Sequence, residues 1–246
     1  MIEIADGRVM TVKVIGFDFF GTLVKAEAEA TICIGNACRK LLRHNINTSD
    51  EEFTQTYREV ASEYRRVRNT TQREVSNRVW ITSTLNRLGY DLEATSPPIV
   101  EAVEAYFDSW VLTVYDDAWE AILNLRESYR IGLISNFTDT SFLTDSLRAL
   151  GLEEYFECVV VSEEVGWRKP HPRIFNRFLT LMNVEPGEVL FVGDDLERDI
   201  QGAKGVNMKT AWIVRTPNRQ TIGETQIRPD YILRSLNELP GILRQP

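Results

Sequence analysis

The sequence predicts an α/β fold in which a parallel sheet is interrupted, after its first strand, by an inserted block of helices. From about residue 117 onward, short apolar runs alternate with helical patterns, which is typical of a parallel sheet connected by helices. Between about residues 26 and 112, apolar residues follow helical spacing and no convincing strand occurs. This stretch is therefore interpreted as an insertion into the α/β core.

Each expected strand is a short apolar run bounded by turn-forming residues. The first covers residues 12–18, ends in Asp18 and is followed by a turn at Gly21. The others are expected at residues 129–135, 158–162, 188–193, 209–214 and 230–233. Ligands of such sheets bind beyond the carboxyl ends of the strands, so the residues that follow each strand are the first candidates for a functional site.

The expected helices fall into two groups. Those of the insertion lie at about 29–45, 50–68, 71–88 and 98–112, and Ser49 followed by three acidic residues marks the start of the second. Those that connect strands, or follow the last one, lie at 117–128, 140–150, 172–182, 197–204 and 235–244. We therefore divide the chain into a core, residues 1–25 and 113–246, and a helical domain, residues 26–112.

Composition excludes several classes of protein. The 246 residues are 43% apolar and 26% charged, which is ordinary for a globular protein, and the net charge of −8 disfavours binding to nucleic acid. No run of about 18 apolar residues occurs, so no membrane-spanning helix is expected. Residues 1–6 carry two acids and no cation, so we expect no secretory signal there.

The cysteines and histidines are too few for a zinc site. Cys33, Cys38 and Cys158 show no CxxC spacing, and the two histidines are His44 and His171. An odd number of cysteines without a disulfide framework fits the reducing cytoplasm, where we expect the protein to be found.

Polar side chains occur at or after the ends of four expected strands, and these ends share one edge of a parallel sheet. The residues are Asp18, Ser135, Asn136, Lys169, Asp194, Asp195 and Asp199. Carboxylates packed this closely repel one another unless a cation lies among them. Because all the candidate ligand atoms are oxygens, Mg²⁺ is the expected ion.

Four stretches, in this order and spacing, resemble the haloacid dehalogenase (HAD) superfamily of hydrolases. They are Phe17–Leu23, Ile131–Asn136, Gly166–Phe175 and Leu190–Ala203. The resemblance implies a Rossmann-like core with a parallel sheet, and it identifies the insertion at 26–112 as a helical cap domain of the C1 type. A phosphorylated small molecule is the expected substrate, with no nucleic acid or membrane partner, and we expect a monomer or homodimer.

The resemblance also implies a role for each matched residue. Asp18 is the expected nucleophile, which forms an aspartyl intermediate with the substrate. Thr22 supports its loop, Ser135 binds a phosphoryl oxygen with Asn136 beside it, and Lys169 neutralises negative charge. The expected Mg²⁺ site is formed by Asp18, the backbone carbonyl of Phe20, Asp194, Asp195 and Asp199.

Phe20 departs from the pattern of the phosphatases in this family, which carry a second Asp at this position as general acid and base. A phenyl ring cannot transfer a proton, and such a group typically contributes about 10²–10⁴-fold to the rate. Three functions remain open. They are a Mg²⁺-dependent phosphohydrolase or phosphotransferase, a metal-free 2-haloacid dehalogenase, and a weakly or non-catalytic binding protein.

The pair Asp194–Asp195 favours the Mg²⁺-dependent phosphohydrolase or phosphotransferase. Without a metal, two carboxylates beside the nucleophile would raise its pKa and weaken it, whereas with Mg²⁺ the same pair is favourable. His171 or Glu197 could replace the missing acid, although a histidine before the expected helix at 172–182 is better explained as a cap. The arginines between Arg58 and Arg78 are interpreted as a solvated helical face paired with glutamates, and the aromatic residues between Trp80 and Tyr115 mainly as core.

Overall fold

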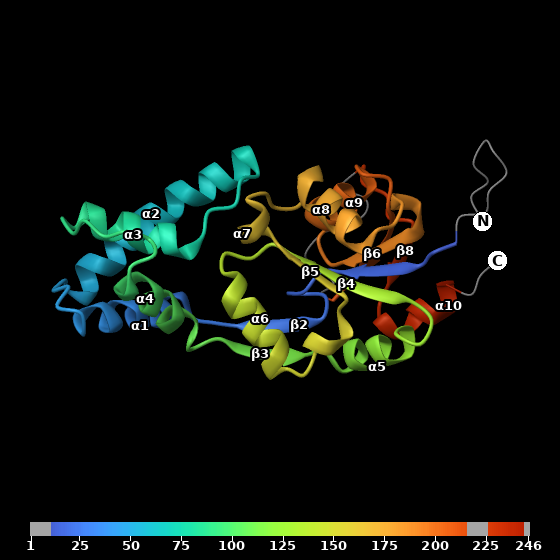
Figure 1. Cartoon of the computed structure of the whole chain (residues 1–246), viewed down its shortest axis with the longest axis horizontal. Coiled ribbons are helices and arrows are strands. Elements are labelled where there is room, and N and C mark those ends of the chain that lie inside the picture. The colour runs from blue at the N-terminus through green and yellow to red at the C-terminus, as the bar shows by residue number, and fades with distance from the viewer. Residues whose placement is uncertain (1–10, 216–225, 244–246) are drawn as a thin grey trace. The chain divides into compact units, whose positions relative to one another are not determined.

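The computed structural model describes residues 11–215 and 226–243, so the prediction made for residues 1–6 lies outside the described residues. Within that part of the chain, two compact units are found (Figure 1). The core unit takes residues from Met1–Lys25, Thr113–Asn136 and Leu147–Pro246, and the inserted unit contains Ala26–Leu112 and Phe137–Ser146. The domain boundaries predicted from the sequence stay a prediction, and they did not anticipate that 137–146 would group with the inserted helices.

The core unit contains a parallel sheet of six strands within the described residues, in the order β5-β4-β1-β6-β7-β8. This confirms the predicted α/β class. The strands are β1 (Val14–Phe17), β4 (Arg130–Ser135), β5 (Cys158–Val161), β6 (Val189–Gly193), β7 (Lys209–Ile213) and β8 (Tyr231–Leu233). Because β1 lies between β4 and β6, the residues that follow these three strands meet at one edge of the sheet.

Helices pack on both faces of this sheet (Figure 1). The helix α8 (Pro172–Met182) buries Ile174, Phe175, Phe178 and Met182 against strand residues, because these positions share one face of the helix. The remaining helical segments that begin in the core unit are α5 (Asp116–Leu125), η1 (Glu153–Tyr155), α7 (Ser162–Val165), η2 (Pro186–Glu188), η3 (Leu196–Gln201), α9 (Gly202–Lys204), η4 (Leu236–Glu238) and α10 (Leu239–Leu243). The helix α6 (Thr140–Ala149) is divided between the units.

The inserted unit is built from α1 (Ala30–Leu42), α2 (Asp50–Thr71), α3 (Asn77–Arg87) and α4 (Pro97–Phe107). Ser49 caps α2 as predicted, because its side chain accepts a hydrogen bond from the N–H of Glu52. The helix α2 continues to Thr71 and ends at Gln72 in the left-handed conformation, so α3 begins later than expected. Among the described helices, none is long and apolar enough to cross a bilayer.

Two short strands were not predicted. β2 (Val24–Glu27) and β3 (Val111–Val114) form a two-stranded sheet where the chain passes between the two units. Each has four residues, and their pairing joins segments more than 80 residues apart in the sequence. Local periodicity carries no information about such a pairing, so the prediction that residues 26–112 contain no strand was wrong at both ends.

Candidate active site

Asp18 directly follows β1 and is 6% exposed. Its backbone N–H donates to the carbonyl of Val192 at 2.9 Å, which fixes the chain where it leaves the sheet. One carboxylate oxygen, Oδ1, lies 2.6 Å from Lys169 Nζ, and the other, Oδ2, accepts from Thr22 Oγ1 at 3.1 Å. Each oxygen of this buried carboxylate therefore has its own partner, Lys169 for Oδ1 and Thr22 for Oδ2.

Lys169 is the buried cation of the site. Besides Asp18, its ammonium donates to the carbonyl of Ile134 at 2.9 Å and forms an ion pair with Asp199 Oδ1 at 2.7 Å. Burial alone would lower the pKa of Lys169, but the carboxylates of Asp18 and Asp199 outweigh it, so the pKa is raised and the ammonium stays charged.

Asn136 holds the backbone of Lys169 by two hydrogen bonds. The N–H of Lys169 donates to Asn136 Oδ1 at 2.7 Å, and Asn136 Nδ2 donates to the carbonyl of Lys169 at 2.9 Å. These two bonds pair the backbone N–H and carbonyl of Lys169, which lies outside the sheet. They also set the position from which the lysine side chain reaches Asp18.

Three carboxylates converge at this edge. Asp18, Asp194 and Asp199 each offer one oxygen, and these oxygens lie within 4.8 Å of one another. Two glycines permit the approach. A Cβ on Gly21 would lie 2.5 Å from Asp194 Oδ2, and a Cβ on Gly193 would lie 2.4 Å from Asp199 Cβ.

Asp199 is the most deeply buried of the three, at 2% exposed. Burial raises the pKa of Asp199 to about 7, although the ammonium of Lys169 opposes this shift, while Asp18 and Asp194 add to it. One ammonium thus faces three carboxylates, and a divalent cation would relieve the remaining repulsion. Oxygen donors at this spacing fit a hard cation such as Mg²⁺, so the residues present suit the ion predicted from the sequence.

Asp195 takes another part. Its Oδ1 accepts from the N–H groups of Glu197 at 3.0 Å and of Arg198 at 2.9 Å, so the side chain caps η3. Its own N–H donates to Asp199 Oδ2 at 3.0 Å. The structure therefore brings Asp18, Asp194 and Asp199 together but does not bring Asp195 into that cluster.

Ser135 ends β4 and is 1% exposed. Among the described residues, its Oγ has no hydrogen-bond partner. A buried hydroxyl without a partner is costly and is usually explained by a ligand, a water molecule or a function. Its position at the shared sheet edge agrees with the phosphoryl-binding role implied by the resemblance, which stays a prediction.

Phe20 stands two residues beyond Asp18. Its ring meets the ring of Phe19 edge-on, with centroids 4.7 Å apart, and its backbone forms a bridge to Val24. The side chain offers no proton at this position, as the sequence indicated. The role of its carbonyl as a metal ligand stays a prediction.

His171 caps α8, since its Nδ1 accepts from the N–H of Arg173 at 3.2 Å, and its ring stacks on Trp167 with centroids 3.9 Å apart. This is the structural role expected for it. Among the arginines between Arg58 and Arg78, Arg68 lies 3.1 Å from Glu74 as expected, but this pair is largely buried and not solvated. Glu63 is paired with Arg87, which lies outside that group.

Sequence reasoning missed two side chains that donate hydrogen bonds to backbone carbonyls of site residues. Trp212 Nε1 donates to the carbonyl of Asp194 at 2.9 Å, and Arg215 Nη2 donates to the carbonyl of Thr22 at 2.7 Å. Both lie at the end of β7 or shortly after it, two strands away from β1. No local pattern marks them, because their partners are backbone carbonyls far away in the sequence.

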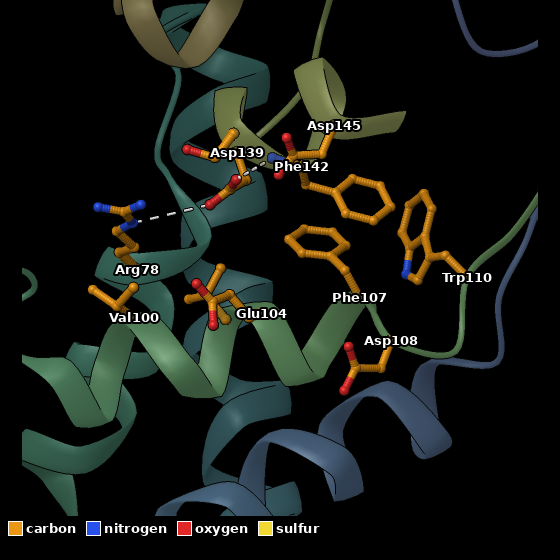
Figure 2. Close-up of a pocket in the computed structure, with 11 residues that line it drawn as sticks. Arg78, Val100, Glu104, Phe107, Asp108, Trp110, Asp139, Phe142 and Asp145 are labelled. Atoms are coloured by element: carbon orange, nitrogen blue, oxygen red, sulfur yellow. Dashed lines mark hydrogen bonds and ion pairs between the residues drawn. The ribbon is translucent and has the colours of Figure 1, made fainter. Parts of the chain in front are cut away.

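The inserted unit contains a hollow of about 420 Å³ (Figure 2). Its aromatic wall is formed by Phe107, Phe142 and Trp110, and the first two rings are stacked with centroids 4.4 Å apart. Its charged lining consists of Arg78 with Glu104, Asp108, Asp139 and Asp145. Four carboxylates against one guanidinium disfavour a phosphate group here.

The comparison with known proteins decides the family. A model of haloacid dehalogenase-like hydrolases matches residues 12–207. The chain belongs to this family. A curated relative, glyceraldehyde 3-phosphate phosphatase of Pyrococcus furiosus, is 32% identical over 241 residues, which cover 95% of this chain and 94% of the relative.

Solved structures agree with this membership. A HAD phosphatase from Thermococcus onnurineus matches with a TM-score of 0.64 and 28% identity, covering 95% of this chain and 98% of that chain. A 2-haloacid dehalogenase from Pseudomonas syringae pv. Tomato DC3000 matches with a TM-score of 0.71 and 22% identity, covering 95% and 98%. The second likeness shows the fold alone. The protein is thus a HAD-family hydrolase whose curated relatives include phosphatases.

Proposed function

We propose that this HAD hydrolase is a Mg²⁺-dependent phosphohydrolase that acts on a phosphorylated small molecule through an aspartyl-phosphate on Asp18. The observation that carries the proposal is the cluster of Asp18, Asp194 and Asp199, whose ligand oxygens lie within 4.8 Å of one another beside the buried ammonium of Lys169. The match to a phosphatase over 95% of the chain supports it.

In the proposed reaction, a carboxylate oxygen of Asp18 attacks phosphorus, and the bond from phosphorus to the leaving oxygen breaks. Water then cleaves the aspartyl-phosphate, which releases inorganic phosphate and restores the carboxylate. Lys169 holds one oxygen of Asp18 and compensates charge, and the unpartnered hydroxyl of Ser135 donates to a phosphoryl oxygen. Mg²⁺, held by Asp18, Asp194, Asp199 and the carbonyl of Phe20, would shield the carboxylates and the phosphoryl group from one another.

Phe20 restricts the choice of substrate. Since no side chain at this position can protonate the leaving oxygen, substrates whose leaving group departs as a stable anion should react fastest. The curated relative is named for glyceraldehyde 3-phosphate, which makes this compound the first natural phosphate to try. A poor rate with it would point to a more acidic leaving group, such as an acyl or aryl phosphate.

The inserted unit is proposed to select the substrate, in keeping with a helical cap. Its hollow is lined by four carboxylates and one guanidinium, so an uncharged or cationic group fits it better than a phosphate. The three cysteines are buried thiols, which agrees with a reducing compartment, and that location stays a prediction.

The decisive experiment measures p-nitrophenyl phosphate hydrolysis with Mg²⁺ and with EDTA, for the native chain and for Asp18→Asn. Nitrophenolate leaves without a proton, so the assay tolerates Phe20. We expect turnover that requires Mg²⁺ and is lost in Asp18→Asn. Asp91→Asn, an exposed carboxylate in the inserted unit, is the matched control and should keep full activity.

The alternative functions predict different results. A dehalogenase would release halide from 2-haloacids with EDTA present, and a binding protein would turn over neither substrate. The carboxylate cluster disfavours the metal-free reaction, because Asp18, Asp194 and Asp199 would repel one another without a cation among them. Activity that is indifferent to EDTA would overturn the proposal.

A further inference from the structure

Arg215 connects three parts of the core unit. Its side chain is 14% exposed, and Nη1 lies 2.8 Å from each carboxylate oxygen of Asp117. Nη2 donates to the carbonyl of Thr22 at 2.7 Å, and the guanidinium lies over the ring of Tyr115, 4.0 Å from its centroid. The proposed function assigns no role to this side chain.

Thr22 relays this contact to the nucleophile. The residue is fully buried, its carbonyl accepts from Arg215, and its hydroxyl donates to Asp18 Oδ2. It lies in a tight turn, in which the N–H of Gly21 donates to the carbonyl of Val24 at 2.9 Å. A displacement of the Thr22 backbone would therefore move the hydroxyl that fixes one oxygen of Asp18.

Asp117 gives Arg215 a firm anchor. It lies in the first turn of α5, and its Oδ2 also accepts from Ser235 Oγ and from the N–H of Leu236, both at 2.9 Å. Burial alone would raise the pKa of Asp117, but the N–H of Leu236 and the guanidinium of Arg215 lower it, so the anchor stays ionised at neutral pH.

The planar guanidinium suits this geometry. It presents separate N–H groups to Asp117 and to Thr22 at the same time, whereas the ammonium of a lysine is a single point at the end of a flexible chain. The contacts of Arg215 thus run from a helix N-terminus, through one rigid fork, to the turn beside the candidate nucleophile.

We propose that Arg215 is a positioning residue, which holds the Thr22 turn against the Asp117 anchor and thereby keeps the Asp18 carboxylate in its reactive orientation. The inference rests on the proposed function for its catalytic consequence. Arg215 touches none of the reacting atoms, so it acts through Thr22.

The first test measures the order of the turn and needs no activity. Amide hydrogen exchange over residues 19–24 is compared in the native chain, Arg215→Met and Arg215→Lys. We expect faster exchange in Arg215→Met and an intermediate rate in Arg215→Lys, because a lysine can restore one contact. Arg148→Met, which removes an exposed ion pair with Glu153 in the same unit, should leave residues 19–24 unchanged.

The second test measures kinetics in a double-mutant cycle. Arg215→Met should lower kcat for p-nitrophenyl phosphate by about 10²-fold with KM changed less than about threefold, because misplacing a reactive group costs rate rather than binding. If the effect passes through Thr22, the double variant Arg215→Met/Thr22→Val should be no slower than the slower single variant. A generally weakened fold would instead give multiplicative losses.

Two outcomes would overturn the inference. One is native exchange over residues 19–24 in every folded Arg215 variant, and the other is multiplicative losses in the cycle. If Arg215→Met does not fold, Asp117→Asn loosens the anchor while keeping the guanidinium, and it should show the same exchange pattern to a smaller degree. A native chain without phosphatase activity would contradict the proposed function, while the exchange test would still decide the positioning role.

Discussion

The polar groups of the core site and those of the hollow in the inserted unit are organised in opposite ways. In the core site, Asp18, Lys169 and Asp199 are each at most 6% exposed and are joined by contacts of 2.6–2.7 Å. In the hollow, Glu104, Asp108 and Asp145 are exposed, and Asp139, although only 4% exposed, lies 3.9 Å from Arg78. Displacing buried, closely spaced charges costs much free energy, because water does not screen them. Exposed charges are screened, so their positions can change at little cost. The difference separates a tightly held charge cluster in the core unit from a more loosely held set of charges in the inserted unit.

The largest effect should follow from removing the buried cation. Lys169→Met leaves Asp18 and Asp199 buried without compensation, so we expect a loss of about 3–5 kcal/mol in unfolding free energy and about 10³-fold or more in kcat. Urea unfolding with and without Mg²⁺ provides the measurement, and Mg²⁺ should restore part of the lost stability. Lys13→Met, which breaks an exposed ion pair with Glu188, is the control and should change little. Equal effects of the two variants would show that the buried ammonium of Lys169 contributes no more than an exposed lysine.

The next effect concerns the space around Asp199. Gly193→Ala places a methyl group 2.4 Å from Asp199 Cβ, so this carboxylate must move away from the cluster. We expect the Mg²⁺ concentration for half-maximal activity to rise and kcat to fall by about 10²-fold. Gly241→Ala, where nothing lies within 4 Å, is the matched control. An unchanged Mg²⁺ dependence in Gly193→Ala would show that Asp199 lies outside the metal site.

A gain of function is expected at Phe20. Phe20→Asp restores a group that can protonate the leaving oxygen, so hydrolysis of alkyl phosphates should rise by about 10-fold or more, while p-nitrophenyl phosphate changes less. The ratio of the two rates is the measurement. The control is Phe20→Asn, because asparagine is isosteric with aspartate but cannot supply the proton. If both variants raise the rates equally, the ring limits access and the missing acid is not the cause.

The smallest effects should come from the hollow. Glu104→Gln and Asp108→Asn remove exposed charges, so we expect unfolding free energies within about 0.5 kcal/mol of the native value. The kcat for p-nitrophenyl phosphate should stay within about threefold, while KM values for larger phosphates shift from substrate to substrate. A tenfold loss of kcat with every substrate would instead show that the hollow takes part in the reaction. The contrast between the core site and the hollow would then be wrong.

The sequence predicted which side chains meet at the sheet edge where the residues lie at or near strand ends. Asp18 and Ser135 were found because a strand ending in a polar residue is a local pattern, and parallel strands bring such ends together. Asp194 and Asp199 were placed at the same edge for this reason.

The sequence could not rank the acidic residues. Asp195 is adjacent to Asp194 in the chain, yet its side chain caps η3, while Asp199 reaches the cluster from within that segment. Which carboxylate turns inward depends on backbone dihedral angles and on the missing Cβ of Gly193, and the order of residue types contains neither.

The sequence by itself determined the α/β class, the helical insertion and the polar edge of the sheet, because periodicity and strand-end residues are local features of the chain. Only the tertiary structure decided the pairing of β2 with β3, the grouping of 137–146 with the inserted unit and the contact of Arg215 with Thr22. These contacts join segments that are far apart in the sequence, and their energies depend on distances and angles that exist only after the chain has folded.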